Sequence, residues 1–259
     1  MEPPSRGKLT GIVAPFQESL SECQLKSDKV LDANDFVVRN APPTIRYIPN
    51  FITEEEEQAL LSRVYTAPKP KWQYLKDRRL QNWGGIVGKN GLISDGNIPE
   101  WLTNVIDRIM TVENGFPCNN RPNHVLINEY LPGQGIMPHT DGPAFFPLVS
   151  TISLGSATYL DFYNVIEQGQ ENPSPIAERF FGTMLLQPRS LVLINSEAYS
   201  THLHGIAERP VDVVHDKIFN RPPGLQLQES HPRQTRISLT IRNVPNVKKI
   251  NVLQMLQKR

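Results

Sequence analysis

The segment Asn128–Asp141, NEYLPGQGIMPHTD, contains side chains that could bind a metal ion. The pattern predicts a strand, a Pro-Gly turn and a short second extended segment. Side chains alternate faces along a strand, so His139 and Asp141 point the same way, as do Asn128 and Tyr130. An imidazole and a carboxylate on one face are two of the three ligands of a facial metal triad. This segment therefore predicts part of a metal site.

A further imidazole comes from the sequence STHLHG, which follows the apolar run 190–195. Either His202 or His204 could complete the triad. Two histidines and one aspartate, with coordination positions left open, form the arrangement found in non-haem ferrous oxygenases. Zinc binds the same ligand types, so these residues alone leave both metals possible.

Two arginines in the sequence RISLTIR predict a binding site for an acidic ligand. Arg236 and Arg242 share one face of the predicted strand with Ser238, and the apolar residues between them occupy the other face. Two guanidinium groups are costly to bury in a small barrel unless acidic groups meet them. Because the guanidinium fork matches carboxylate geometry, we expect a ligand with two carboxylates.

From His124 onward, short apolar runs alternate with turns that contain Gly, Pro and Asn. This pattern predicts a β-sandwich, jelly-roll or barrel. The predicted strands are residues 124–131, 149–156, 159–165, 183–188, 190–195 and 236–244. Two insertions, 169–181 and 209–234, have the length of functional lids or disordered loops.

Two helices precede this region. Thr53 and Glu56 form a capping box at the start of the first, and its four glutamates are expected to face solvent. The predicted buried face of this helix is Ala59, Leu60 and Val64. A second amphipathic helix is predicted over residues 101–110.

The segment 67–90 between these helices is basic and aromatic. Six Lys or Arg residues and one Asp lie between Thr66 and Asn90. Aromatic side chains among cations can stack on bases and hold phosphates, although they could also simply anchor a surface loop to the core. The candidate contact residues are Lys69, Lys71, Trp72, Tyr74, Arg78, Arg79 and Trp83.

The composition fits one large domain. We expect a leader at 1–40, a domain at 41–247 and a basic tail at 248–259 in this chain of 259 residues. A net charge of +1 does not by itself indicate a nucleic-acid-binding protein. The two cysteines, Cys23 and Cys118, are too few for a disulfide framework, and no apolar run approaches the length of a membrane span. A soluble intracellular protein is therefore expected.

The motifs NxYxPG, HxD, HG and RxxxxxR, in this order, resemble the AlkB family of Fe(II)- and 2-oxoglutarate-dependent dioxygenases over about residues 42–245. The sequences APKPKW, RRLQNWGG, LPGQGIMPHTDGP and STISLGS resemble the sixth AlkB-homologue branch of eukaryotes, with a plant-type member expected. The resemblance implies an α+β, mainly β fold with a double-stranded β-helix (jelly-roll) core and supporting helices. It also implies that the segment 67–90 is a nucleotide-recognition-type lid.

The resemblance implies a role for each motif residue. The iron ligands would be His139, Asp141 and His204, because the family's distal histidine directly precedes a glycine. The distal carboxylate of 2-oxoglutarate would be held by Arg236, Tyr130 and Ser238, and the carboxylate that is lost by Arg242 and Asn128. No catalytic residue beyond the metal centre is implied.

The implied reaction uses Fe(II), 2-oxoglutarate and O₂, and it releases succinate, CO₂ and, from an N-methyl group, formaldehyde. The expected substrate is alkylated RNA or DNA, bound through the lid and the basic tail. The segment Gly142–Phe146 lacks the acidic residue that DNA-repair members can carry after HxD. The alternatives are a nucleic-acid-binding protein with weak oxygenase activity, a protein hydroxylase or demethylase and, more remotely, a zinc hydrolase or sugar-binding cupin. We expect a monomer in the cytoplasm and nucleus, without membrane contact.

Overall fold

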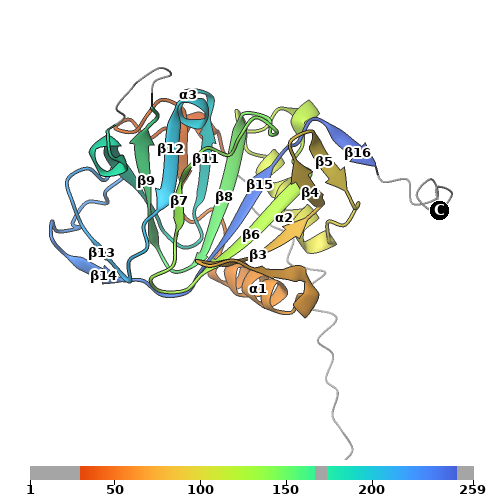
Figure 1. Ribbon diagram of the computed structural model, residues 1–259, viewed down its shortest axis with the longest axis horizontal. Helices are drawn as coiled ribbons and strands as arrows, with labels where there is room; N and C mark the ends of the chain where they lie inside the picture. Colours follow the sequence, from red (N-terminus) through yellow and green to blue (C-terminus); the bar gives the residue numbers. More distant parts are fainter. Residues whose placement is uncertain (1–29, 167–173, 250–259) are drawn as a thin grey trace, which may run out of the picture. The chain divides into compact units, whose positions relative to one another are not determined.

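Two antiparallel sheets contain most of the strands in the computed structural model, which describes residues 30–166 and 174–249 (Figure 1). Within these ranges the major sheet has seven strands in the order β1-β11-β8-β15-β6-β3-β2. They are β1 (Ile45–Ile48), β2 (Trp72–Tyr74), β3 (Arg79–Trp83), β6 (His124–Tyr130), β8 (Leu148–Gly155), β11 (Leu191–Asn195) and β15 (Arg236–Arg242). The minor sheet, in the order β10-β9-β12-β7, consists of β7 (Ile136–His139), β9 (Thr158–Asn164), β10 (Phe180–Leu186) and β12 (His202–Ile206). The predicted mainly β fold is confirmed.

The major sheet has a helix-facing side and a side that faces the minor sheet. On β15, Ile237, Leu239 and Ile241 are buried in the core that the sheet shares with the helices. The alternate residues Arg236 and Arg242 line a pocket between the two sheets. The alternation predicted for this strand therefore sets which side chains meet the pocket.

The helices are α1 (Glu54–Tyr65), α2 (Glu100–Met110) and the short α3 (Ser196–Ser200). The predicted capping box of α1 is present, since the Thr53 side chain accepts from the Glu56 N–H and the Glu56 carboxylate accepts from the Thr53 N–H. None of the helices in the described part of the chain is long and apolar enough to cross a membrane.

The predicted buried face of α1 is only partly correct. Leu60 and Val64 are buried, but Ala59 is exposed and Glu57 takes a buried position. The Glu57 carboxylate accepts from the Gly155 N–H at 2.8 Å and pairs with Arg189 at 3.1 Å. The expectation that all four glutamates face solvent is therefore wrong, because β8 and its neighbouring turn provide partners that the helix sequence does not reveal.

The segment 67–90 extends the major sheet. Its strand β3 pairs along β6, with Leu80 opposite Asn128 and Arg79 opposite Glu129, and β2 pairs with β3. The segment continues into β4 (Gly85–Gly88), which pairs with β5 (Gly91–Ser94). β16 (Val247–Lys249) adds to β5 in parallel, so the described start of the predicted basic tail is a strand. Residues 250–259 of that tail lie outside the described residues.

The predicted insertion 209–234 forms regular structure that packs on the minor sheet. It contains β13 (Val211–Val213) and β14 (Ser230–Pro232), which pair with each other, and its Val214 and Ile218 are buried against the minor sheet. In the predicted insertion 169–181, residues 169–173 lie outside the described residues, and β10 already begins at Phe180. At the N-terminus, a compact unit begins at Leu31, ahead of the predicted boundary at residue 41.

The minor-sheet strand β7 contains a β-bulge beside the pocket. Ile136 and His139 both line the pocket, although residues three apart on a regular strand face opposite sides. The register with β12 shifts between His204 and Ile206, so two residues of β7 stand opposite Gly205. A Cβ atom at Gly205 would lie only 2.9 Å from the Ile136 carbonyl oxygen, so the close approach of the strands requires glycine.

Candidate metal and co-substrate site

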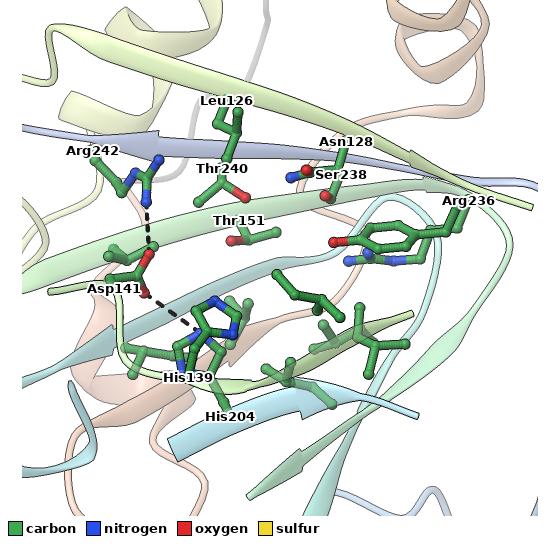
Figure 2. Close-up of a pocket in the computed structure, with 18 residues that line it drawn as sticks. Leu126, Asn128, His139, Asp141, Thr151, His204, Arg236, Ser238, Thr240 and Arg242 are labelled. Atoms are coloured by element: carbon green, nitrogen blue, oxygen red, sulfur yellow. Dashed lines mark hydrogen bonds and ion pairs between the residues drawn. The ribbon is translucent and has the colours of Figure 1, made fainter. Parts of the chain in front are cut away.

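The pocket lies between the two sheets and receives polar side chains from both (Figure 2). Those from the major sheet are Asn128, Tyr130, Thr151, Arg236, Ser238, Thr240 and Arg242. The opposite wall carries His139 on β7, His204 on β12 and Asp141 just after β7. The cavity volume is about 90 Å³, several times the space that one water molecule needs, so a small ligand can enter.

The three predicted metal ligands meet in this pocket. His139 and His204 are direct partners in the pairing of β7 with β12, and their ring centroids are 4.7 Å apart. The Asp141 Oδ2 atom is 3.6 Å from His204 Nε2. His202 instead packs against Phe181, with ring centroids 4.9 Å apart, and is not among the pocket-lining residues. The geometry therefore favours His204 over His202 as the second histidine.

A hydrogen bond at His139 and burial at His204 both suit metal binding. His139 Nδ1 lies 2.8 Å from the Met137 carbonyl oxygen, so Nδ1 carries the proton and Nε2 is left as the electron-pair donor. Burial lowers the pKa of His204 to about 4, with further lowering by His139 and Arg242 and an opposing effect of Asp141. His204 is therefore neutral at pH 7. Two imidazoles and a carboxylate are the donor set that ferrous oxygenases use.

The side chains do not yet converge on one point. In the described part of the chain, no group of three or more His, Cys, Asp or Glu side chains is close enough to hold a metal ion as it stands. Asp141 is held by its neighbours, since its Oδ1 accepts from Arg242 Nη1 at 2.8 Å while its Oδ2 lies 3.6 Å from His204 Nε2 (Figure 2). The residues fit an iron site in chemical type, and Arg242 holds the carboxylate.

Arg236, at the other end of the pocket, is a buried cation with few partners. It is 4% exposed, and its Nη2 donates to Ser153 Oγ at 2.9 Å. Its Nε has no hydrogen-bond partner, and no carboxylate of the described residues lies within ion-pair distance. Burial lowers its pKa to about 10, so it remains charged at pH 7. A buried cation without an acidic partner is costly, so a ligand carboxylate fits this position.

Tyr130 and Ser238 complete the surroundings of Arg236. The guanidinium carbon lies 5.8 Å from the centroid of the Tyr130 ring, and both Tyr130 and Ser238 line the pocket. All five residues predicted to hold 2-oxoglutarate therefore face one cavity. Arg242 differs from the prediction in that Asp141 already engages its guanidinium.

The residues predicted to contact a nucleic acid occupy several environments. Trp72 and Trp83 are each 9% exposed and belong to the main hydrophobic core, so neither offers a free face for a base. Lys69 is exposed, and Lys71 lies over the Trp83 ring at 4.1 Å. Tyr74 is 74% exposed. The structure therefore does not support substrate contact by the two tryptophans.

The two neighbouring arginines of this segment point to opposite faces of the major sheet. Arg79 lies on the helix-facing side, where Nη2 donates to Glu129 Oε1 at 2.9 Å and the guanidinium covers the Trp72 ring at 4.1 Å. This position explains why Arg79 is also unavailable to a ligand in the pocket. Arg78 lies on the pocket side, where its Nε donates to Asn128 Oδ1 at 3.2 Å.

Sequence reasoning missed three features of the site. These are the pairing of Arg242 with Asp141, the support of Arg236 by Ser153, and the contact between Arg78 and Asn128. The alternation of the strand 149–156 could have placed Ser153 on the pocket side. The other two contacts depend on how strands distant in sequence are paired.

Comparison with known proteins identifies the family. The sequence profile of the 2OG-Fe(II) oxygenase superfamily matches residues 94–242. A Danio rerio protein named "Probable RNA/DNA demethylase ALKBH6" is 43% identical over 226 residues, which cover 86% of this chain and 95% of that protein. The uncharacterized protein L905 of Acanthamoeba polyphaga mimivirus is 29% identical over 202 residues, 76% of this chain and 83% of its own.

A solved structure supports the same assignment at the level of fold. The structure of OsALKBH1 superimposes with a TM-score of 0.52 at 15% identity, covering 78% of this chain and 98% of that chain. The family predicted from the sequence motifs is confirmed, whereas its plant-type detail stays a prediction. The chain therefore belongs to the 2OG-Fe(II) oxygenase superfamily and is an AlkB homologue.

Proposed function

We propose that this protein, a dioxygenase that uses Fe(II), 2-oxoglutarate and O₂, oxidatively demethylates alkylated nucleic acid, either RNA or DNA. The observation that supports the chemistry is the pocket itself. One wall carries two imidazoles beside a carboxylate, and the other carries a buried guanidinium that has no acidic partner among the described residues.

The proposed site assigns one task to each group of residues. His139, Asp141 and His204 hold the iron. Arg236, with Tyr130 and Ser238, binds the distal carboxylate of 2-oxoglutarate, and Asn128 and Arg242 serve the carboxylate that is lost. When bound, iron and 2-oxoglutarate supply the oxidising chemistry, in which O₂ delivers one oxygen atom to succinate and one to the substrate methyl group. The resulting N-hydroxymethyl group breaks its C–N bond to give the N–H product and formaldehyde.

The protein residues orient the reactants and exclude water. The Met137 carbonyl fixes the tautomer of His139, and Arg242 fixes the Asp141 carboxylate. Apolar side chains fill the rest of the pocket lining, so few water molecules can compete for the same positions. The apolar lining residues are Leu126, Ile136, Val149, Leu160, Leu186, Val192, Ile194 and Ile206.

The choice of nucleic acid as substrate is supported by two observations. The Danio rerio relative, 43% identical, carries an RNA/DNA demethylase name. On this chain, Tyr74 of the β2–β3 hairpin is 74% exposed, and Lys69, which lies just before β2, is also exposed. An exposed aromatic ring among cations can stack on a base and attract phosphates. We propose Tyr74 and Lys69 as part of the contact surface.

The test is turnover with Fe(II), 2-oxoglutarate and oligonucleotides that carry N-methylated bases. RNA and DNA versions are compared with the same unmethylated sequences, and formaldehyde, succinate and the demethylated nucleoside are measured. We expect methylated oligonucleotides to stimulate all three products, and His139→Ala to abolish them. Stimulation by methylated peptides alone would indicate a protein hydroxylase or demethylase. Oligonucleotide binding that His139→Ala leaves unchanged, without turnover of the wild-type protein, would indicate a binding module.

The monomeric state, the cytoplasmic and nuclear localisation and the division into leader, domain and tail remain predictions. Size-exclusion chromatography with light scattering and imaging of the tagged protein test the first two.

A further inference from the structure

The turn between β2 and β3 brings a lid arginine to the wall of the pocket. The turn is closed by a hydrogen bond of 2.9 Å from the Leu75 N–H to the Arg78 carbonyl oxygen. Arg78 Nε then donates to Asn128 Oδ1 at 3.2 Å, across 50 residues of sequence. Asn128 lines the pocket and shows its side chain beside Ser238 in Figure 2.

The strand register explains why Arg78 reaches the pocket side. Leu80 on β3 stands opposite Asn128, and Arg79 stands opposite Glu129. Since paired residues share a face and alternate residues return to it, Arg78 lies on the side of Asn128 and Arg79 on the other. The contact is therefore a product of how β3 is paired with β6.

The charge of Arg78 also reaches the next pocket residue along β6. Burial raises the pKa of the Tyr130 hydroxyl, and the positive charges of Arg236 and Arg78 partly offset that rise. Arg78 is thus close enough to the co-substrate end of the pocket to act there electrostatically.

The hydrogen bond has a consequence for the orientation of the Asn128 amide. A guanidinium group offers only donors, whereas an asparagine side chain has an acceptor oxygen and a donor NH₂ group. With Oδ1 facing Arg78, the NH₂ group is what Asn128 can offer to a ligand. The reverse orientation would place donors against donors. A carboxylate is an acceptor, so only the orientation set by Arg78 can bind one.

We propose that Arg78 is a positioning residue for 2-oxoglutarate, which holds the Asn128 amide in the orientation that donates to the co-substrate. The inference rests on the proposed role of Asn128 in the co-substrate site. Because Arg78 belongs to the turn of the β2–β3 hairpin, displacement of the hairpin breaks this hydrogen bond. Co-substrate affinity therefore depends on the position of the segment that the family uses as a lid.

The test is calorimetric titration of the Mn(II)-loaded full-length protein with 2-oxoglutarate. We expect Arg78→Ala and Asn128→Ala each to weaken binding about ten- to a hundredfold, the effect of one charge-assisted hydrogen bond. If Arg78 acts through Asn128, the double variant binds no more weakly than Asn128→Ala alone. Arg78→Lys, which keeps a donor, should recover part of the affinity. The matched control is Lys76→Ala, which removes an equal charge from an 88%-exposed side chain in the same turn.

Three outcomes would overturn the inference. The first is an Arg78→Ala protein with wild-type affinity, the second is additive losses in the double variant, and the third is an equal loss in Lys76→Ala. Failure of the wild-type protein to bind 2-oxoglutarate would instead overturn the proposed co-substrate site, and the inference with it. Thermal melting of each variant identifies any loss of affinity that comes from unfolding.

Discussion

Each end of the pocket carries a buried arginine, but the two arginines have different surroundings. Arg236 and Arg242 are 4% and 7% exposed and lie on the same face of β15. Arg242 is paired with Asp141 at 2.8 Å, whereas no carboxylate of the described residues lies within ion-pair distance of Arg236. Among the described residues, the cation at one end of the pocket has an acidic partner and the cation at the other end has none.

Because of this difference, variants at the two ends should affect different properties, namely the stability of the fold at the Arg242 end and ligand binding at the Arg236 end. Removing one partner of a buried ion pair leaves an uncompensated charge and destabilises the fold. Removing a buried cation that has no acidic partner relieves a desolvation cost, so the fold is not destabilised and only the affinity for an acidic ligand falls. The following variants test whether the two ends differ in this way.

The largest effect is expected for Asp141→Ala. It removes a proposed iron ligand and leaves Arg242 buried without its partner. We expect turnover to fall at least about 1000-fold, or about 4 kcal/mol, and the metal-free protein to lose about 3–5 kcal/mol of unfolding free energy. Turnover assays and denaturant titration measure the two effects. His139→Ala is the control, because it should abolish turnover with a smaller loss of stability. Equal stability of Asp141→Ala and the wild type would contradict the role of the pair.

The second test is Arg236→Leu at the unpaired end. We expect affinity for 2-oxoglutarate to fall roughly 30- to 100-fold, or about 2–3 kcal/mol, because a charge-assisted hydrogen-bond pair is lost. The melting temperature of the metal-free protein should stay the same or rise, because no acidic partner is abandoned. Calorimetry and thermal melting measure these. A destabilisation as large as that of Asp141→Ala would remove the distinction between the two ends.

The third test uses His124, which lies opposite Arg242 in the pairing of β15 with β6. Burial, with a smaller effect of Arg242, lowers the pKa of His124 from 6.5 to about 3. The unfolded chain therefore binds a proton below pH 6.5 that the folded protein does not, so this histidine reduces stability as the pH falls from 6.5 towards 3. When the pH is lowered from 7 to 5, the free energy of unfolding of His124→Phe should fall by about 2 kcal/mol less than that of the wild type. Denaturant titrations at the two pH values measure this change. An equal fall in the wild type and in His124→Phe would argue against a neutral buried imidazole.

The smallest effect is expected in the β2–β3 hairpin, where one aromatic side chain is exposed and another is buried. Tyr74 is 74% exposed, with its hydroxyl accepting from Arg79 Nη1 at 3.4 Å, whereas Trp72 is buried. Tyr74→Ala should weaken oligonucleotide binding by about 1 kcal/mol, roughly fivefold, without changing the melting temperature. Trp72→Phe should change stability and leave affinity for oligonucleotides nearly unaltered. Fluorescence anisotropy measures the affinities. A loss of oligonucleotide affinity in Trp72→Phe and not in Tyr74→Ala would contradict the proposed contact surface.

Local sequence patterns predicted much of the site. Alternation on the strand 236–242 placed both arginines and Ser238 on one face, and the capping box marked the start of α1. These features depend on residues close together in the sequence, where strand and helix periods act directly. The family motifs also predicted that His204 and His139 share one site, and both residues line the same pocket.

The features that were missed depend on pairing between distant segments. Whether Arg78 or Arg79 faces the pocket is decided by the register of β3 against β6, and a slip of one residue would exchange them. The burial of Glu57 depends on Arg189 and on the backbone at Gly155, both far along the chain. A charge-rich segment therefore gives no direct sign of which of its charges become buried.

The bulge in β7 has a consequence for changes in chain length. A one-residue deletion in a strand normally turns every following side chain to the other face. Between Ile136 and His139, however, β7 has one residue more than β12 needs, and Met137 is 78% exposed. Deleting Met137 would remove the extra residue, leave Pro138 opposite Gly205, and keep Ile136 opposite Ile206 and His139 opposite His204. The deletion also removes the Met137 carbonyl that accepts from His139 Nδ1, so it separates the position of this imidazole from the hydrogen bond that fixes its tautomer.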